Sequence, residues 1–545
     1  MLLQPTLNHY HCCHGGVVKI LHDSRVRFVP AVVTCSSSSS HHSLVHNYNT
    51  VDYEKRPPLE WKSVYRKVSF AAEGLEGPPP EAVAGGLSTT AAVLSRCEAE
   101  GKKLTKWELC MVVKELRKYR RFRQALEVYD WMNDHDKKYR LSSSDAAIQL
   151  DLIAKVFGVS SAEDFFMKLS DELKDRRVHG ALLNAYARGR MKDKAESFMN
   201  NIREKGYASN SLPFNVMMTL YMNLEDHDKV ELLVSEMRDK NIQLDIYSYN
   251  IWLSSQGSLG SVERVEEVFE QMKLDRRINP NWTTFHTLAR LYIEMGELAK
   301  AEDSMKKIET RLTGRDRKPY HYLVSLYANI GNKEETYRVW NIYKAAFPTI
   351  PNLGYHAMVS SLVRLGDILG AEEVYKEWLS VRTSLDPKIG NVLMGFYVKE
   401  GDMGKAEILL DQMIELGGKP NASSWEILAE GHIRERRISE AFACFVKAFS
   451  SERLGGWKLR PINVTGFFQL CEEEGDLLKK EALIGLLRQS NFLENQRYAS
   501  LVGLSSSNTD IPEDDRVHGT LPLPSDDEPD SGGDLLTNQL QGTAM

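Results

Sequence analysis

Cysteine is scarce in this chain and is not arranged for disulfide or zinc chemistry. The seven cysteines stand at positions 12, 13, 35, 97, 110, 444 and 471. The number is odd and no two of them form a spaced pair suited to zinc. The cluster of His9, His11, Cys12, Cys13 and His14 matches no ligand spacing of a structural metal site. We therefore expect no disulfide framework, no metal site and no cofactor.

Long apolar runs and a surplus of positive charge are also missing. No apolar stretch approaches the roughly 20 residues that span a bilayer, so the sequence predicts no transmembrane helix and no membrane partner. The formal net charge is −6, but residues 505–545 contribute −8 and residues 1–50 contribute +2, which leaves the middle of the chain neutral. Nucleic-acid binders usually carry a basic excess. Binding of that kind would therefore depend on a local stripe of cations.

The two ends differ in composition from the middle. Residues 1–50 contain one acid and many hydroxyl side chains, including the run Ser36–Ser40, which is typical of an organelle transit peptide. The Val-Val-Thr-Cys-Ser stretch and the shortage of arginine favour the chloroplast, with the mitochondrion as the alternative. Residues 51–105 are interpreted as a linker with disordered residues, because Gly, Pro and Ala accumulate from Ala71 to Ser95. Residues 505–545 are expected to form a disordered acidic tail.

One segment of about 35 residues fills the middle of the chain as a repeat. Clear units begin at Arg176, Ser211, Ile246, Trp282, Arg317, Asn352, Pro387 and Ala422. Position eleven is mostly tyrosine, position twenty is small or β-branched, and position twenty-four is apolar in every unit. Weaker units begin at Lys106 and Ser143, and an uncertain one lies near Pro461. A fixed period of this size indicates a solenoid over residues 106–495, in which each unit buries its apolar face against its neighbours.

Each unit is predicted to be an antiparallel pair of helices. In residues 387–421, Val392, Leu393, Phe396 and Tyr397 follow one helical face, and Gly401 then interrupts the pattern before a second apolar face. The predicted fold is an all-α solenoid of ten or eleven helical hairpins.

This period and the recurring Tyr…Gly…Ala pattern resemble the pentatricopeptide repeat family of plant organellar RNA-binding proteins, in its P-class, over roughly residues 106–490. Unit starts such as Tyr249-Asn250 and Tyr355-His356 also match that repeat, whereas the related tetratricopeptide repeat has a period of 34. The resemblance implies a right-handed superhelix whose first helices line the concave face. It also implies that each repeat reads one base of single-stranded RNA with two or three side chains.

In this family the main reader is the fifth residue of a repeat, assisted by the last residue. Carried over position by position, the resemblance implies the pairs Asn215 with Asp245, Asn250 with Asn281, His286 with Asp316, His321 with Pro351, His356 with Asp386, and Asn391 with Asn421. Asn with Asp resembles the family's uridine combination, and Asn with Asn its cytidine-or-uridine combination. The resemblance also pairs Gly180 with Asn210 by position. The three histidines depart from the pattern and receive no base, and Gly180, Pro351 and Glu426 depart from it too.

Two further positions are expected to contact RNA. The second residue of a repeat should flank the bases, and Leu212, Tyr247 and Leu353 are the candidates for base stacking. Position thirteen is often basic in the family and should contact phosphates. Its cations in this chain are Lys118, Lys155, Arg188, Arg364, Lys399 and Arg434, of which the last four are our phosphate-contacting candidates.

Three functions follow from the sequence. The first is an organellar RNA-binding protein that acts in splicing, transcript stabilisation or translation without catalysis, alone or with other RNA-processing proteins. The second is a protein-interaction scaffold, for example on an organellar ribosome, favoured by the uneven reader positions and the neutral repeat region. The third, an RNA-processing enzyme, lacks support because the chain has no C-x-x-C of a zinc deaminase. Nothing indicates a small-molecule substrate.

Overall fold

The computed structural model describes residues 60–72, 88–135, 138–382, 385–451, 457–490, 492–494 and 496–502. Over these residues the chain forms 25 α-helices, one 3₁₀ turn and no β-strand. The predicted transit peptide and acidic tail lie outside the described residues. None of the described helices combines the length and hydropathy of a bilayer span.

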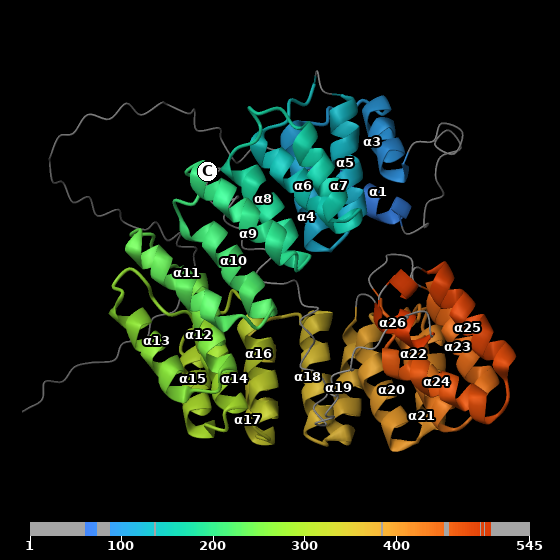
Figure 1. Ribbon diagram of the computed structural model, residues 1–545. Coiled ribbons are helices and arrows are strands. Elements are labelled where there is room, and N and C mark those ends of the chain that lie inside the picture. The colour runs from blue at the N-terminus through green and yellow to red at the C-terminus, as the bar shows by residue number, and fades with distance from the viewer. Residues whose placement is uncertain are drawn as a thin grey trace, which may run out of the picture. The chain divides into compact units, whose positions relative to one another are not determined.

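The helices alternate in eleven consecutive hairpins within the described residues (Figure 1). The first helices are α4 (Lys106–Lys118), α6 (Ser143–Val156), α8 (Arg176–Arg188), α10 (Ser211–Asn223), α12 (Ile246–Ser258), α14 (Trp282–Glu294), α16 (Lys318–Asn329), α18 (Asn352–Arg364), α20 (Pro387–Glu400), α22 (Ala422–Arg434) and α24 (Pro461–Glu473). The second helices are α5 (Phe122–Asp134), α7 (Val159–Lys168), α9 (Lys192–Glu204), α11 (His227–Asp239), α13 (Val262–Leu274), α15 (Leu298–Glu309), α17 (Lys333–Ala346), α19 (Ile368–Val381), α21 (Met403–Glu415), α23 (Ile438–Ser451) and α25 (Leu477–Gln489). The uncertain unit near Pro461 is therefore a complete hairpin. Two short elements, η2 (Phe492–Glu494) and α26 (Gln496–Leu501), follow it.

Side-chain caps fix where several first helices begin. The caps of α10, α12, α14, α20 and α22 accept hydrogen bonds from backbone N–H groups of the first turn, and they are Asn210, Asp245, Asn281, Asp386 and Asn421. Such caps satisfy donors that a helix start leaves unpaired. Each is also the last residue of its repeat, so helix-start chemistry positions one member of a predicted reader pair.

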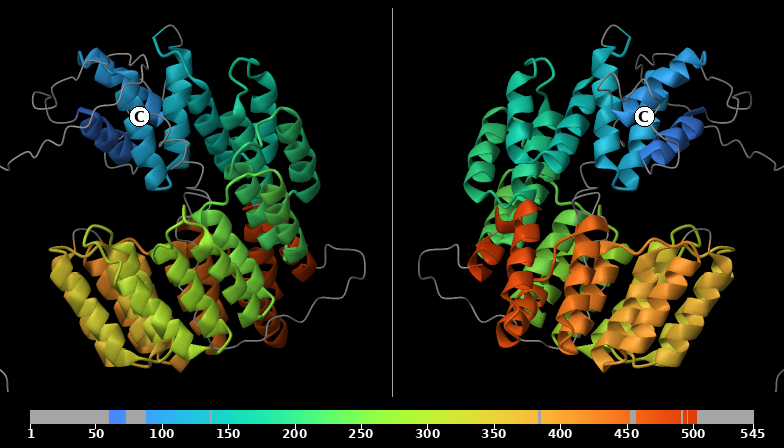
Figure 2. Two further views of the ribbon diagram at one scale, coloured as in Figure 1. Left: turned by 90° about the vertical axis from the view of Figure 1, so that its left-hand side faces the viewer. Right: turned by 90° about the vertical axis from the view of Figure 1, so that its right-hand side faces the viewer.

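The hairpins stack on one another around a shared core. One apolar cluster contains residues of every hairpin from α6 to α25, and each hairpin lies beside the next in Figures 1 and 2. Ala195, Ala301 and Ala406, which hold position twenty, are 0% exposed. This sharing of apolar surface between neighbours is what defines an α-solenoid, as predicted.

The interpretation of residues 51–105 as a linker is wrong for two segments. Glu60–Ala72 forms α1 and Thr89–Ala99 forms α3. Val64, Val68 and Leu94 are buried with side chains of α4 and α5 in a second apolar cluster. These helices are short and flank a Gly- and Pro-rich stretch, so their apolar spacing was hidden by the composition of their surroundings.

Candidate nucleic-acid interface

Asn215 of α10 is joined to Asp245, the cap of α12. Its Nδ2 donates to both carboxylate oxygens of Asp245, at 3.1 and 3.2 Å, and its Oδ1 accepts a 2.7 Å hydrogen bond from the Ser248 hydroxyl. The carboxylate also accepts a 2.6 Å hydrogen bond from Ser211. Asn215 is only 1% exposed. The structure thus brings this predicted pair together and encloses the amide between two repeats.

Asn391 and Asn421 repeat this arrangement at the junction of α20 and α22. The Nδ2 of Asn391 donates to Asn421 Oδ1 over 3.2 Å, and its Oδ1 accepts from the Ser424 hydroxyl at 2.8 Å. Here the amide is half-buried rather than enclosed. Of the two amides held in this way, that of Asn391 is the one with exposed surface for a ligand.

Asn250 and Asn281 are bridged by a third residue. Asn250 Nδ2 donates to the Thr283 hydroxyl at 3.1 Å, and that hydroxyl donates to Asn281 Oδ1 at 2.6 Å. Asn250 Oδ1 is buried and accepts no hydrogen bond from a described residue. A buried acceptor without a donor is uncommon, so the Asn250 carbonyl is a hydrogen-bonding position that the described side chains leave unsatisfied.

Two of the predicted histidine readers contact tyrosines. His286 of α14 packs on Tyr322 of α16, with ring centroids 4.4 Å apart, and Nε2 of His321 lies 2.8 Å from the Tyr343 hydroxyl of α17. Removal from water lowers the pKa of His286 and of His321 to about 4. Both imidazoles are therefore neutral near pH 7.

His356 and the last residues of the histidine repeats are not joined as pairs. Burial lowers the pKa of His356, and its Nδ1 forms no hydrogen bond within the described residues. Asp316 and Asp386 instead accept from the backbone N–H groups of the residues two positions later, at 3.0 and 3.1 Å. Pro351, paired with His321 by position, has no side-chain polar atom. The three predicted histidine pairs thus make no hydrogen bond between their members in the described structure.

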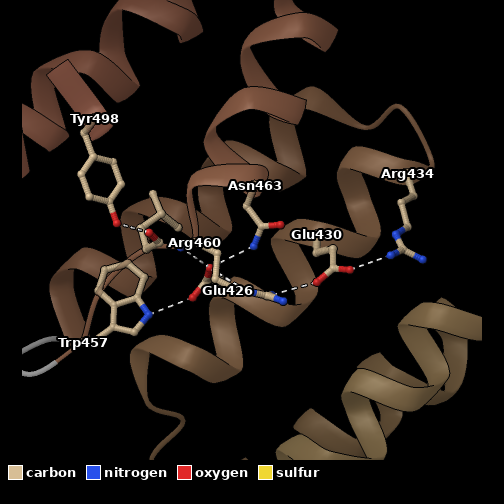
Figure 3. Close-up of polar contacts among 8 residues, drawn as sticks. Glu426, Glu430, Arg434, Trp457, Arg460, Asn463 and Tyr498 are labelled. Atoms are coloured by element: carbon tan, nitrogen blue, oxygen red, sulfur yellow. Dashed lines mark hydrogen bonds and ion pairs between the residues drawn. The ribbon is translucent and has the colours of Figure 1, made fainter. Parts of the chain in front are cut away.

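Glu426, at position five of α22, forms its hydrogen bonds with the C-terminal end of the solenoid. It is 4% exposed, and its carboxylate accepts from Trp457 Nε1 at 2.9 Å, from the Arg460 backbone at 2.8 Å and from Asn463 Nδ2 at 2.9 Å (Figure 3). Arg460 continues the network by donating to Glu430 at 2.8 Å. Glu426 has no predicted reader partner, and its carboxylate accepts hydrogen bonds from the last hairpin and from the segment that leads into it.

The three predicted stacking residues differ in exposure. Tyr247 is 36% and Leu353 38% exposed, whereas Leu212 is partly buried against the core. Tyr247 and Leu353 therefore offer free apolar surface at position two, and Leu212 offers less.

Nearby acidic side chains reduce the positive charge that the predicted phosphate stripe presents. Arg188 donates to Asp151 at 3.1 Å, and Arg434 donates to Glu430 at 2.7 Å. Asp151 also pairs with Lys155 at 3.0 Å. These cations are partly neutralised by acids that lie one turn away or on the neighbouring first helix.

The other two stripe residues differ from each other. Arg364 donates to Asn329, and burial lowers its pKa. Lys399, near the end of α20, is exposed and makes no ion pair with another described residue. Lys399 is thus the stripe cation that the structure leaves most accessible.

Sequence reasoning missed the residues that hold the amides. Ser248 and Ser424 stand at position three of the following repeat, and Thr283 stands at position two. The available signal was a serine three residues after an acidic or amide cap, which is a capping-box spacing.

Family models match the repeats directly. The pentatricopeptide repeat domain model matches residues 232–295, and the PPR repeat model matches residues 178–207, 213–242, 355–381 and 391–418. A pentatricopeptide repeat-containing protein of Arabidopsis thaliana is 57% identical over 497 residues, which cover 91% of each chain. This chain belongs to the pentatricopeptide repeat family.

Other pentatricopeptide repeat relatives correct the expected location. One Arabidopsis thaliana member named as mitochondrial is 32% identical over 404 residues, covering 74% of this chain and 82% of the relative. Four further relatives also carry mitochondrial names, and the name of the 57% identical relative gives no location. The chloroplast expectation is therefore overturned. A hydroxyl-rich, acid-poor leader is common to both organelles, and a low arginine count was too weak to separate them.

Two further similarities are to pentatricopeptide repeat proteins whose names place one in a ribosomal subunit and the other in a complex with RNA. The large ribosomal subunit protein mL101 (rPPR4) of Arabidopsis thaliana is 33% identical over 389 residues, covering 71% of this chain and 79% of the relative. The solved structure of PPR10 in complex with an 18-nt psaJ RNA element is 17% identical, with a TM-score of 0.41 over 76% of this chain and 59% of that one.

Proposed function

We propose that this pentatricopeptide repeat protein binds single-stranded RNA along its first helices, in mitochondria, and acts in RNA metabolism without chemistry of its own. The observation that carries the proposal is the half-buried amide of Asn391, which is held by Asn421. The same helix, α20, also presents Lys399, which is exposed and makes no ion pair with a described residue. A carboxamide offers both donors and an acceptor to a base edge, and an ammonium group attracts phosphate.

An earlier repeat, that of α12, adds to this interface. The carbonyl of Asn250 accepts no hydrogen bond from a described residue, and Tyr247 on the same helix is exposed. Stacking of a base on an aromatic side chain contributes about 1–3 kcal/mol. The cations already paired with Asp151 and Glu430 add less, which favours modest affinity and moderate salt dependence.

Crosslinking and immunoprecipitation of the tagged protein from isolated mitochondria, with sequencing of the bound RNA, tests the proposal. One or a few short footprints rich in pyrimidines are expected, and their positions would indicate splicing, transcript stabilisation or translation. An absence of crosslinked RNA would overturn the proposal.

A ribosomal scaffold is the second candidate, and it is favoured by the similarity to mL101. Two features of this chain agree with it, namely the neutral charge of the repeat region and the histidine repeats that carry no base code. In the same experiment it predicts signal confined to ribosomal RNA, together with co-sedimentation of the protein with the large subunit.

A further inference from the structure

Ser424 connects two residues that the family resemblance assigns to base reading. Its hydroxyl lies 2.8 Å from Asn391 Oδ1 and 2.9 Å from Asn421 Oδ1. Its backbone N–H donates to Asn421 Oδ1 at 2.9 Å, and the Asn421 backbone N–H donates back to the hydroxyl at 3.2 Å. The serine thus completes a capping box and at the same time donates toward the amide of the preceding repeat.

These contacts set the direction of the Asn391 amide. Its oxygen faces the Ser424 hydroxyl and its nitrogen faces Asn421 Oδ1. Rotating the amide by half a turn would place two carbonyl oxygens against each other, and of its two acceptors the Ser424 hydroxyl would keep Asn421 Oδ1 and lose Asn391 Oδ1. Two neutral hydrogen bonds, one of them from Ser424, therefore hold one orientation.

Amide orientation matters because the two pyrimidines differ at N3. Uracil carries a hydrogen-bond donor there, whereas cytosine carries an acceptor. A side-chain amide that can turn over offers either its oxygen or its nitrogen and accepts both bases, while a fixed amide presents one of the two. We propose that Ser424 is a positioning residue that makes the Asn391 repeat discriminate between uracil and cytosine. The inference rests on the proposed RNA binding, and it differs from the undiscriminating Asn/Asn combination that the family resemblance implies.

Ser248 provides a matched control within the same chain. Its hydroxyl makes the same contacts with Asn215 and Asp245, at 2.7 and 3.1 Å, and it completes the same capping box. Without Ser248, however, the Asn215 amide would still be held by the Asp245 carboxylate, because a charged acceptor binds roughly twice as strongly as a neutral one. The structural cost of removing either serine is therefore similar, whereas the effect on amide orientation is larger at Ser424.

The experiment uses the full chain and a pool of random 20-nt RNAs. Selection with wild type and with Asn391→Ala identifies the base that this repeat contacts, and two RNAs that differ only by U or C at that base are then titrated. Wild type is expected to prefer one of them by about fivefold, the factor expected for one net hydrogen bond. Ser424→Ala is expected to reduce the ratio to less than twofold, and Ser424→Thr, which keeps the hydroxyl, to restore it.

The outcomes separate this inference from the proposed function. Failure of wild type to bind any RNA of the pool would overturn the function itself. Binding with equal affinity for U and C, or an unchanged ratio in Ser424→Ala, would overturn only the role of Ser424. The same loss of U-over-C preference at the Asn391 base in Ser248→Ala would also overturn the role of Ser424, because a general loss of stability would then explain both variants. Asn421→Asp adds a last check. Its carboxylate should hold the Asn391 amide without help from the serine, so the preference between U and C should no longer change when Ser424→Ala is added.

Discussion

The indole N–H of Trp457 donates to the carboxylate of Glu426 over 2.9 Å, across the end of the repeat array. Glu426 stands where other repeats carry a predicted reader, yet it is 4% exposed and surrounded by donors of the following segment. A carboxylate is stable at such depth only when hydrogen bonds replace its hydration. Position five of α22 therefore stabilises the solenoid end, and the predicted reading track stops at Asn391.

Replacing Glu426 by alanine should loosen the last hairpin. The substitution removes the acceptor of Trp457 Nε1, of the Arg460 backbone N–H and of Asn463 Nδ2, and breaking a buried charged network by removing one partner costs roughly 3–5 kcal/mol. Because repeat proteins open locally, we expect faster hydrogen exchange and proteolysis in α24 and α25. Glu415→Ala, on the exposed surface of α21, should change neither rate. Equal protection of both variants would contradict the assigned role.

Two glycines within first helices should respond oppositely to alanine. A Cβ added at Gly257 would lie 2.3 Å from a methyl carbon of Leu291, whereas none of the described atoms lies within 4 Å of one added at Gly395. Overpacking costs about 1–3 kcal/mol, while alanine in an open helical site stabilises by up to about 1 kcal/mol. Chemical denaturation should therefore show Gly257→Ala destabilised and Gly395→Ala unchanged or more stable. A neutral Gly257→Ala would mean that α12 and α14 separate at little cost.

The hairpins could be predicted from the sequence because their signals are local. The break at Gly401 was visible as a glycine between two apolar faces, and in the structure Gly401 has φ of +80° and ends α20. Gly475 likewise marks the turn of the final hairpin. The short helices α1 and α3 were missed, because their stability comes from packing on α4 and α5 and not from a repeated pattern.

The site was only partly predictable because its contacts join different repeats. Positions five and last were identified as pairs, and two of these pairs meet through their side chains. The contact of His286 with Tyr322 depends on how closely α14 and α16 pack, which no spacing within one repeat reveals. The partner of Arg188 is hidden in the same way, since Asp151 stands in the preceding unit.

The half-buried histidines His286 and His321 predict a loss of stability in mild acid. His286 and His321 have a pKa of about 4 in the folded protein, below the ordinary value of about 6.5. Between these values the unfolded chain binds more protons, so stability rises with pH and is lost as the pH falls from 6.5 toward 4. The magnitude is on the order of 1–3 kcal/mol for each histidine. The double variant His286→Gln, His321→Gln should therefore show a smaller drop in Tm between pH 7 and pH 5 than wild type. His227→Gln serves as the control for loss of an imidazole elsewhere, and parallel Tm curves for all three proteins would contradict the prediction.

Lys399 and Arg434 should contribute unequally to RNA affinity. Lys399 is exposed without an ion pair among the described residues, whereas Arg434 donates to Glu430 at 2.7 Å. Each cation that neutralises a phosphate releases a counterion and steepens the dependence of log K on log salt by about one unit. Lys399→Glu should therefore weaken binding to all RNA sequences alike and flatten that slope. Arg434→Glu should have a smaller effect, because Glu430 already neutralises part of its charge, and Arg364→Glu should weaken binding in the same sequence-independent way. Titrations between 50 and 200 mM salt test the ranking, and an unchanged slope in Lys399→Glu would place the phosphates away from the ends of the first helices.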